Sequence, residues 1–443
     1  MINIEKDKFI ENVRRKFLGA NDLLDEFDRV MPQHGPKKFL QAIKLYIKIV
    51  QEYFEDKLKR EQTDEDVKKL CKEVINWLVK VHEHFLPYLA ESKETSVPSE
   101  LFPAFVQIVR RLFKIKSTFE FGLFPSWEHN YGFYGFQDIM KNKDISLLLE
   151  LLPDTIRENI SEEAKNLPQW IVFYSYPYVE TNLTLSLTPL IHEIAHLKDH
   201  DEKIHTNLLP EKLHEDSFNK YIKLITKSPA PSGRKIKKET GSEEQLTLGD
   251  FLHEEDIRLG EFKKISEIIT NWIKEIVADL LTLHVIGPAY LFSFIETLIM
   301  PGTNENYSNT HPSALLRLKL IVEEIEFLGY MEGLHNIDLR NKLKRYNESL
   351  REYKASPTEL ISEVAYLSIE GKFPEIQKKV REVIGKDSFR CPMYNENVPV
   401  LIEEFKKGQP PIEHWSEEKN DFEPYDFVSI LNAAWEFYET DFD

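Results

Sequence analysis

Two histidines and a glutamate in the segment LTPLIHEIAHLKDH, residues 187–200, have the spacing of a metal site. On a helix, His192 and His196 lie about one turn apart on the same face, so both imidazoles can bind one ion. Glu193 projects beside them, where it can hydrogen-bond a water molecule at the metal instead of ligating the metal. This is the H-E-x-x-H pattern of zinc hydrolases. Such a zinc site also needs a third protein ligand and an open fourth position.

The third ligand must come from elsewhere in the chain. His200 lies eight residues after His192, about 12 Å along a helix axis, so it cannot share an ion with both other histidines. We expect it at the surface or just outside the ligand set. Glu275 and Asp279 in NWIKEIVADLL lie four residues apart on one face of a helical segment. Their apolar surroundings make unpaired carboxylates costly.

We therefore predict that Glu275 is the third ligand. Asp279 can then accept the free N–H of a ligating histidine and fix its orientation. The alternative is an acidic pair on a solvated helix face.

The order of three motifs resembles the gluzincin metallopeptidases. H-E-x-x-H is followed by E-x-x-A-D and then by THPSALLRL, which contains Thr310, His311, Pro312 and Arg317. The pattern looks most like the branch that contains the prenyl-CAAX endopeptidase and the heat-shock membrane peptidases. The similarity covers roughly residues 170–320, and the chain departs from that branch in showing no membrane spans.

The resemblance implies a role for each of these residues. It implies zinc as the cofactor, with Glu193 as the general base, His311 approaching the scissile carbonyl and Arg317 bracing the site through Asp279. The zinc ligands that it implies are His192, His196 and Glu275. Independently of the family, a helix that begins at Thr310-His311-Pro312 would place His311 at its N-cap, facing a developing oxyanion. The alternative for His311 is an ordinary helix cap.

The elements that must position these residues follow from local patterns. WIVFYSYPYV, residues 170–179, is rich in aromatic and β-branched residues and predicts a strand. Residues 181–187 predict a second strand, with an edge to which an extended peptide can add. Thr188 and Pro189 then favour a helix start. The expected fold is mainly α (α+β), a helical zincin-like catalytic domain with a small β-sheet beside the active-site helix.

The chain organisation predicts three regions. Residues 1–150 form a helical N-terminal region, residues 151–330 form the metallopeptidase core with a polar, hairpin-like insertion at 201–262, and residues 331–443 form a helical C-terminal region. Residues 280–300 predict two buried helices that meet at Gly287-Pro288.

Four further segments carry local expectations. Thr63 and Asp66 predict a helix cap, and Cys71 lies on an apolar stripe and is expected in a core. The aromatic segment 119–136 suits a loop or cleft lining, and aromatic packing alone is the alternative explanation. The Pro- and Asn-rich segment 391–400 is expected to interrupt the C-terminal helices. The tail 413–443, with ten acidic residues and one lysine, is expected to be solvated.

Composition limits the function classes. A formal net charge of −18 argues against a nucleic-acid surface. Two cysteines exclude a disulfide framework, and no signal core or membrane span is expected, which favours a cytoplasmic protein. We expect a zinc-dependent peptidase acting on a peptide or protein. The alternatives are a zinc hydrolase of a non-peptide substrate and a non-enzymatic interaction protein with a structural zinc site. The oligomeric state does not follow from the sequence.

Overall fold

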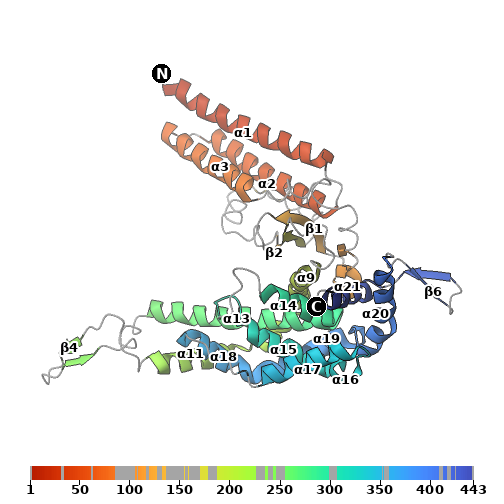
Figure 1. Cartoon of the computed structure of the whole chain (residues 1–443). Helices are drawn as coiled ribbons and strands as arrows, with labels where there is room; N and C mark the ends of the chain where they lie inside the picture. The colour runs from red at the N-terminus through yellow and green to blue at the C-terminus, as the bar shows by residue number, and fades with distance from the viewer. Residues whose placement is uncertain are drawn as a thin grey trace. The chain divides into compact units, whose positions relative to one another are not determined.

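The structure is a computed structural model of the chain. It describes residues 2–30, 34–60, 63–84, 105–106, 108–115, 119–126, 132–135, Asp154, Glu158, 170–177, 187–225, 235–237, 243–245, 255–298, 307–351, Tyr353, 359–408, 413–416, 421–424 and 426–441. Within these residues the fold is mainly α-helical, as the sequence predicts. The chain divides into two compact units, residues 1–183 and 184–443 (Figure 1). The finer division into three regions stays a prediction.

The first unit contains three long amphipathic helices. These are α1 (Ile2–Val30), α2 (His34–Lys59) and α3 (Asp64–His84), and a short π-helix, η1 (Ile108–Leu112), follows them. Val13, Val50 and Cys71 are among the apolar residues that form one buried core between the helices. Thr63 Oγ1 accepts a hydrogen bond from the Asp66 backbone N–H, and the Asp66 carboxylate accepts one from the Thr63 N–H, each at 3.2 Å. This reciprocal pair is a capping box. The expected cap and the core position of Cys71 are confirmed.

A three-stranded sheet also belongs to the first unit. Its strands, in the order β1-β3-β2, are β1 (Phe119–Ser126), β3 (Trp170–Pro177) and β2 (Gly132–Gly135). β3 runs parallel to β1, with Phe119 opposite Trp170, and antiparallel to β2, with Phe133 opposite Tyr174. The strand expected at 170–179 is confirmed over residues 170–177, and the last two residues lie outside the described ones. The expectation of a loop at 119–136 is wrong for residues 119–126 and 132–135, because the alternating aromatic residues there suit a pleated sheet. The rest of that segment lies outside the described residues.

The small sheet expected beside the active-site helix is not confirmed. The three strands belong to the first unit, whereas the helix that carries the two histidines belongs to the second. The second expected strand, residues 181–187, lies outside the described residues except for Leu187, which begins helix α9.

The second unit contains the remaining described elements. In chain order its helices are α9 (Leu187–Glu202), α10 (Ile204–Leu208), α11 (Glu211–Ile225), α13 (Glu255–Ile286), α14 (Pro288–Leu298), α15 (Ala314–Phe327), α16 (Tyr330–Gly333), α17 (Ile337–Arg351), α18 (Leu360–Ile369), η4 (Glu370–Lys372), α19 (Phe373–Ile384), η5 (Gly385–Asp387), α20 (Cys391–Lys406) and α21 (Phe427–Asp441). Two antiparallel hairpins complete it: β4 (Lys235–Lys237) with β5 (Glu243–Gln245), and β6 (Glu413–Ser416) with β7 (Asp421–Pro424).

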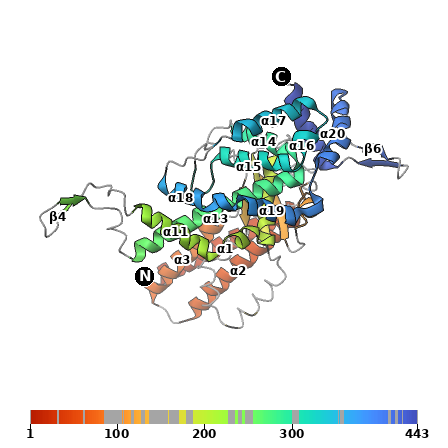
Figure 2. The ribbon, with the colours of Figure 1, turned by 90° about the horizontal axis from the view of Figure 1, so that it is seen from below.

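Helix α13 is the central element of this unit. It packs against α9, α11, α15, α18 and α19 (Figure 1), and the last four are also labelled beside it in Figure 2. From Ile265 to Leu283 most of its side chains are buried, so neighbouring helices cover the greater part of its surface. Polar side chains on such a helix need partners from the neighbouring helices.

Helices α13 and α14 meet at Gly287, as the sequence predicts. Gly287 has φ +66°, and a Cβ there would lie 2.7 Å from a ring carbon of Phe389, so only glycine fits. The side chain of Asn432 in α21 pairs with backbone groups on both sides of this joint. It accepts a hydrogen bond from the Ala289 N–H at 2.9 Å and donates one to the Ile286 carbonyl at 2.7 Å. The C-terminal helix therefore holds the joint between the two core helices.

Two expectations for the C-terminal region are wrong. The segment at 391–400 does not interrupt the helices, because α20 runs through it with Pro392 in its first turn and Pro399 inside. Part of the acidic tail is core, since α21 buries Leu431 and Trp435. The Trp435 indole N–H donates to Thr188 Oγ1 at 3.1 Å, which ties α21 to the start of α9.

The insertion at 201–262 contains more helix than expected. The β4–β5 hairpin confirms its hairpin-like part, but α10, α11 and the start of α13 also fall within it. Phe218 of α11 packs edge-on against Phe262 of α13, with ring centroids 5.5 Å apart. None of the helices in the described part of the chain has the length and apolar character needed to cross a bilayer.

Candidate metal centre

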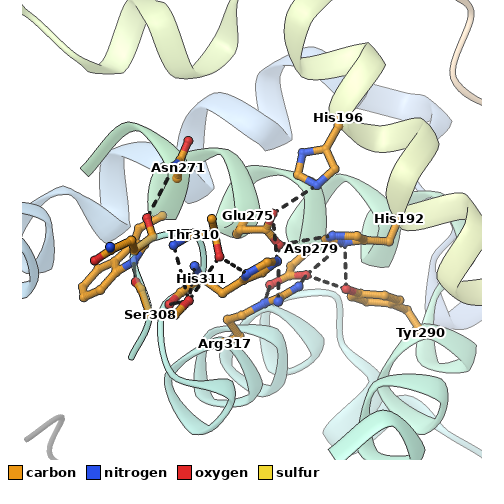
Figure 3. A network of polar contacts seen from close by, with 12 residues as sticks. His192, His196, Asn271, Glu275, Asp279, Tyr290, Ser308, Thr310, His311 and Arg317 are labelled. Atoms are coloured by element: carbon orange, nitrogen blue, oxygen red, sulfur yellow. Dashed lines mark hydrogen bonds and ion pairs between the residues drawn. The ribbon is translucent and has the colours of Figure 1, made fainter. Parts of the chain in front are cut away.

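Helices α9 and α13 bring the three expected ligands together. His192 and His196 lie one turn apart on α9 and face Glu275 of α13 (Figure 3). His192 Nε2 lies 3.4 Å from Glu275 Oε2, and His196 Nε2 lies 3.3 Å from Glu275 Oε1. One ligand atom from each of the three residues falls within 4.8 Å of the others. Two imidazoles four positions apart and a carboxylate at least 79 positions after them in the chain thus form a group that could hold a metal ion.

The surroundings of Glu275 fit a bound cation. The side chain is only 12% exposed, and Oε2 is buried without a hydrogen bond from any residue that the structure describes. A buried carboxylate oxygen left in this way is costly unless a cation or a donor compensates it. Arg317 Nη1 approaches Oε2 to 3.3 Å but makes no hydrogen bond with it. The carboxylate therefore retains coordinating capacity on the side that faces the two histidines.

Asp279 lies one turn after Glu275 and contacts His192 from the other side. Its Oδ1 lies 3.1 Å from His192 Nδ1, the ring nitrogen opposite Nε2. Arg317 of α15 donates to both Asp279 oxygens, from Nε at 2.7 Å and from Nη2 at 2.6 Å. The structure therefore contains both contacts expected from the sequence, between Asp279 and His192 and between Arg317 and Asp279. Asp279 is 2% exposed, so it needs both partners.

The charges at the centre favour proton binding when no metal is present. Burial opposes a charge on His192, but the neighbouring carboxylates of Asp279 and Glu275 outweigh it and raise its pKa to about 10. Burial likewise opposes ionisation of Glu275, yet His196 and Arg317 lower its pKa well below the ordinary value. A metal ion and a proton therefore compete for His192, so metal binding at neutral pH releases a proton.

Glu193 lies next to the ligands without belonging to the metal-binding group. Burial raises the pKa of its carboxyl, and the positive charges of His196 and His192 partly offset that rise. Its carboxylate is thus within electrostatic reach of the centre and is more basic than an exposed glutamate. A raised pKa is the property expected of a general base that works near neutral pH.

His311 lies at the edge of the centre and is not a helix cap. Its Nε2 is 3.5 Å from Glu275 Oε1, its side chain is 54% exposed, and its Nδ1 lies 2.8 Å from Thr310 Oγ1. The expectation that His311 is the N-cap is wrong. Ser313 is the N-cap of α15, and its hydroxyl accepts a hydrogen bond from the Leu316 N–H at 3.2 Å. His311 is therefore presented by the turn that precedes the helix, with its imidazole half open to solvent.

That turn is held firmly from α13. The Trp272 indole N–H donates to the Ser308 carbonyl at 2.8 Å, and Asn271 donates to the Asn309 carbonyl at 3.3 Å (Figure 3). The Ser308 hydroxyl accepts a hydrogen bond from the His311 N–H at 2.9 Å. The same helix that supplies Glu275 therefore also fixes the backbone that carries His311.

Two other residues complete the description. His200 is exposed in the last turn of α9 and does not belong to the metal-binding group, in keeping with the sequence argument. Tyr290 of α14 was not expected at the site, yet its hydroxyl lies 3.0 Å from His192 Nδ1 and donates to Asp279 Oδ1 at 2.5 Å. The Gly-Pro pair at 287–288 indicates that the chain bends just before Tyr290, but no pattern in the sequence shows that the bend leads back to α9.

Comparisons of the chain with models of protein families, with curated proteins and with solved structures found no match.

Proposed function

We propose that the protein is a zinc-dependent peptidase whose ligands are His192, His196 and Glu275. The observation that carries the proposal is the convergence of both imidazole Nε2 atoms on one buried carboxylate, with Glu193 adjacent to them. Two histidines and one carboxylate are the ligand set of several catalytic zinc sites, and they leave a fourth position open. The order of the three motifs along the chain, which resembles the gluzincins, supports the same assignment.

Zinc, when bound, polarises a carbonyl oxygen and makes water acidic enough to react near neutral pH. Glu193 is then the group that removes a proton from the attacking water, because it is the basic carboxylate beside the ligands. It subsequently delivers that proton to the nitrogen of the leaving amine. His311 donates a hydrogen bond from Nε2 to the carbonyl oxygen as negative charge develops there.

The residues around the ligands keep them in place during these steps. Asp279 accepts a hydrogen bond from His192 Nδ1, which orients the imidazole, and Arg317 holds Asp279 with two hydrogen bonds. Trp272 holds the turn that presents His311. The choice of amide bonds as substrate rests on the motif resemblance, since the same centre can hydrolyse other bonds.

The decisive experiment compares three proteins in metal analysis and in a broad peptide-library digest. The native chain should hold about one zinc and cleave peptides. Glu275→Ala should lose the zinc. Glu193→Gln should keep the zinc and the fold but lose at least about 100-fold in turnover, the low end for removal of a general base.

Each other result counts against part of the proposal. A zinc-loaded Glu193→Gln variant with native turnover would refute the general-base role. Full zinc occupancy in Glu275→Ala would refute the ligand assignment. A zinc-loaded native chain that cleaves no peptide would exclude the peptidase and favour the non-peptide hydrolase or the structural zinc site.

A further inference from the structure

Tyr290 is the one buried hydroxyl in the described part of the chain that bridges a candidate ligand and its carboxylate partner. The residue is 3% exposed, and its ring lies within 5° of parallel to the His192 imidazole, with the centroids 6.0 Å apart. Its hydroxyl makes both contacts at once, 3.0 Å from His192 Nδ1 and 2.5 Å from Asp279 Oδ1 (Figure 3). The hydroxyl therefore lies on the side of His192 that faces away from Glu275.

The position of the protons follows from these contacts. A tyrosine hydroxyl has one proton to donate, and an ionised carboxylate can only accept. Tyr290 therefore donates to Asp279, and its remaining lone pairs are available to His192. His192 Nδ1 must then carry a proton and donate it to Tyr290 or to Asp279 Oδ1, which lies 3.1 Å away. Of the two ring nitrogens, only Nε2 remains free to coordinate a metal.

The Asp279 carboxylate is shared among several hydrogen-bond donors. Arg317 already donates two hydrogen bonds to it, at 2.6 and 2.7 Å, and Tyr290 donates a third. These three donors compete with His192 for the same carboxylate, and the guanidinium balances its charge. The oxygen of Tyr290 supplies His192 with a second acceptor, whereas the hydrogen bonds of Arg317 go to Asp279. A bound imidazole held by two acceptors has less freedom to rotate or to change tautomer than one held by a single acceptor.

The fold places Tyr290 by means of the α13–α14 joint. It lies three positions after Gly287, where the positive φ and the close approach of Phe389 fix the direction of the turn. Asn432 fixes the backbone on both sides of the turn through Ile286 and Ala289. The tyrosine is therefore held by a rigid joint and not by its own contacts with His192.

We propose that Tyr290 is a positioning residue that keeps the His192 Nδ1–H in place and so presents Nε2 to the metal ion. The inference rests on the proposed ligand set, but not on any peptide being the substrate. It predicts that the hydroxyl contributes to metal affinity through His192, without touching the metal or the substrate.

The experiment compares two variants, each of which lacks the hydroxyl of one buried tyrosine. Tyr290→Phe deletes the contact and keeps the ring. The matched control is Tyr330→Phe, because Tyr330 is also buried and its hydroxyl donates to a backbone oxygen, that of Phe389 at 2.9 Å. For each protein we would measure the zinc dissociation constant with a competing chelator. Proton–nitrogen NMR would follow the His192 Nδ1–H and its exchange with water, in the metal-free and the zinc-loaded forms.

The expected result separates the two variants. Tyr290→Phe should weaken zinc binding by about 10–100-fold, the usual effect of losing a partner of a ligating histidine, and should speed exchange of the Nδ1–H. Tyr330→Phe should change neither. Native zinc affinity and native Nδ1–H exchange in Tyr290→Phe would overturn the inference. If the native chain bound no zinc, the proposed function would fail, and the exchange rate in the metal-free protein would still decide the role of Tyr290.

Discussion

Removal of the Arg317 side chain should destabilise the second unit in a way that zinc partly reverses. Arg317 is 12% exposed and supplies two hydrogen bonds to Asp279, which is 2% exposed, while its Nη1 lies 3.3 Å from Glu275. Its guanidinium also lies 5.0 Å from the ring centroid of Phe294. Arg317→Met preserves the apolar stem but leaves two carboxylates in the interior without this cation.

The magnitude follows from the burial. Removing one partner of a buried ion pair costs about 3–5 kcal/mol, because the other charge stays behind without compensation. Since Arg317 retains some exposure, we expect the lower end, about 3 kcal/mol of unfolding free energy, in the metal-free protein. Zinc supplies a new positive charge at Glu275 but does not replace the hydrogen bonds to Asp279. Zinc should therefore recover about 1–2 kcal/mol of the loss, a fraction of the roughly 4 kcal/mol between adjacent unit charges at an intermediate dielectric.

A second arginine provides the control. Arg381 makes the same paired contact with the buried Glu324, from Nε at 2.6 Å and Nη2 at 2.7 Å, and it lies 3.3 Å from the ring centroid of Phe327. It takes no part in the proposed ligand set. Arg381→Met should destabilise the unit by a similar amount, and zinc should not reverse any of this additional loss.

The assay must report on the second unit alone, because the chain has two units. Hydrogen exchange of peptides from α13, measured through a urea series with and without zinc, gives the local unfolding free energy. The reasoning would be refuted by zinc recovering stability equally in both arginine variants, or by Arg317→Met leaving the exchange of α13 unchanged.

The remaining predictions concern residues around the centre and in the core. His311→Ala should lower kcat by about 100-fold with little change in KM or zinc content, whereas Ser313→Ala should cost about 1 kcal/mol of stability with kcat preserved; kinetics and melting on both variants check this. Hydrogen bonds from His284 and Arg381 outweigh burial and lower the pKa of Glu324. Its contribution to stability should be complete above the ordinary pKa of about 4.3 and be lost as pH falls through the lowered value. Glu324→Gln should be less stable at pH 7 and show a smaller further loss on acidification, by denaturant unfolding. Asn432→Ala leaves the Ala289 N–H and Ile286 carbonyl unsatisfied and should cost about 2 kcal/mol in the same assay.

The candidate metal-binding group could be predicted because it depends on local helical geometry. His192 and His196 share a face through the periodicity of one helix, and the apolar residues around Glu275 and Asp279 mark those carboxylates as needing partners. Neither argument requires knowledge of how the helices pack. The distances that join α9 to α13 come only from the fold, although the order of motifs pointed to the same set.

The wrong expectations fall where a local pattern was judged without its tertiary setting. The acidic tail was expected to be solvated from its net charge, but α21 buries Leu431 and Trp435. It also buries the carboxylate of Glu436, which accepts hydrogen bonds from Asn336 and Tyr394. The two prolines of α20 suggested an interruption, but one lies in the first turn, where no backbone N–H is needed. Composition thus describes a segment as a whole, whereas the burial of each residue depends on the side of the helix on which it lies.

His311 lies beside the centre as the sequence predicts, although its predicted position as the helix cap is wrong. In the sequence, Thr310-His311-Pro312 suits a helix start. In the structure the hydroxyl of Ser313 caps α15, so the His311 imidazole does not cap that helix. Its backbone is held by Ser308, and its ring faces Glu275 while remaining half exposed. An imidazole that the fold positions but does not bury can contact a substrate group at the centre. The failure of the cap expectation removes the alternative of an ordinary cap, and it also removes the helix-start argument for an oxyanion contact. The proposed catalytic role therefore rests on the position of the ring beside Glu275 and on the motif resemblance.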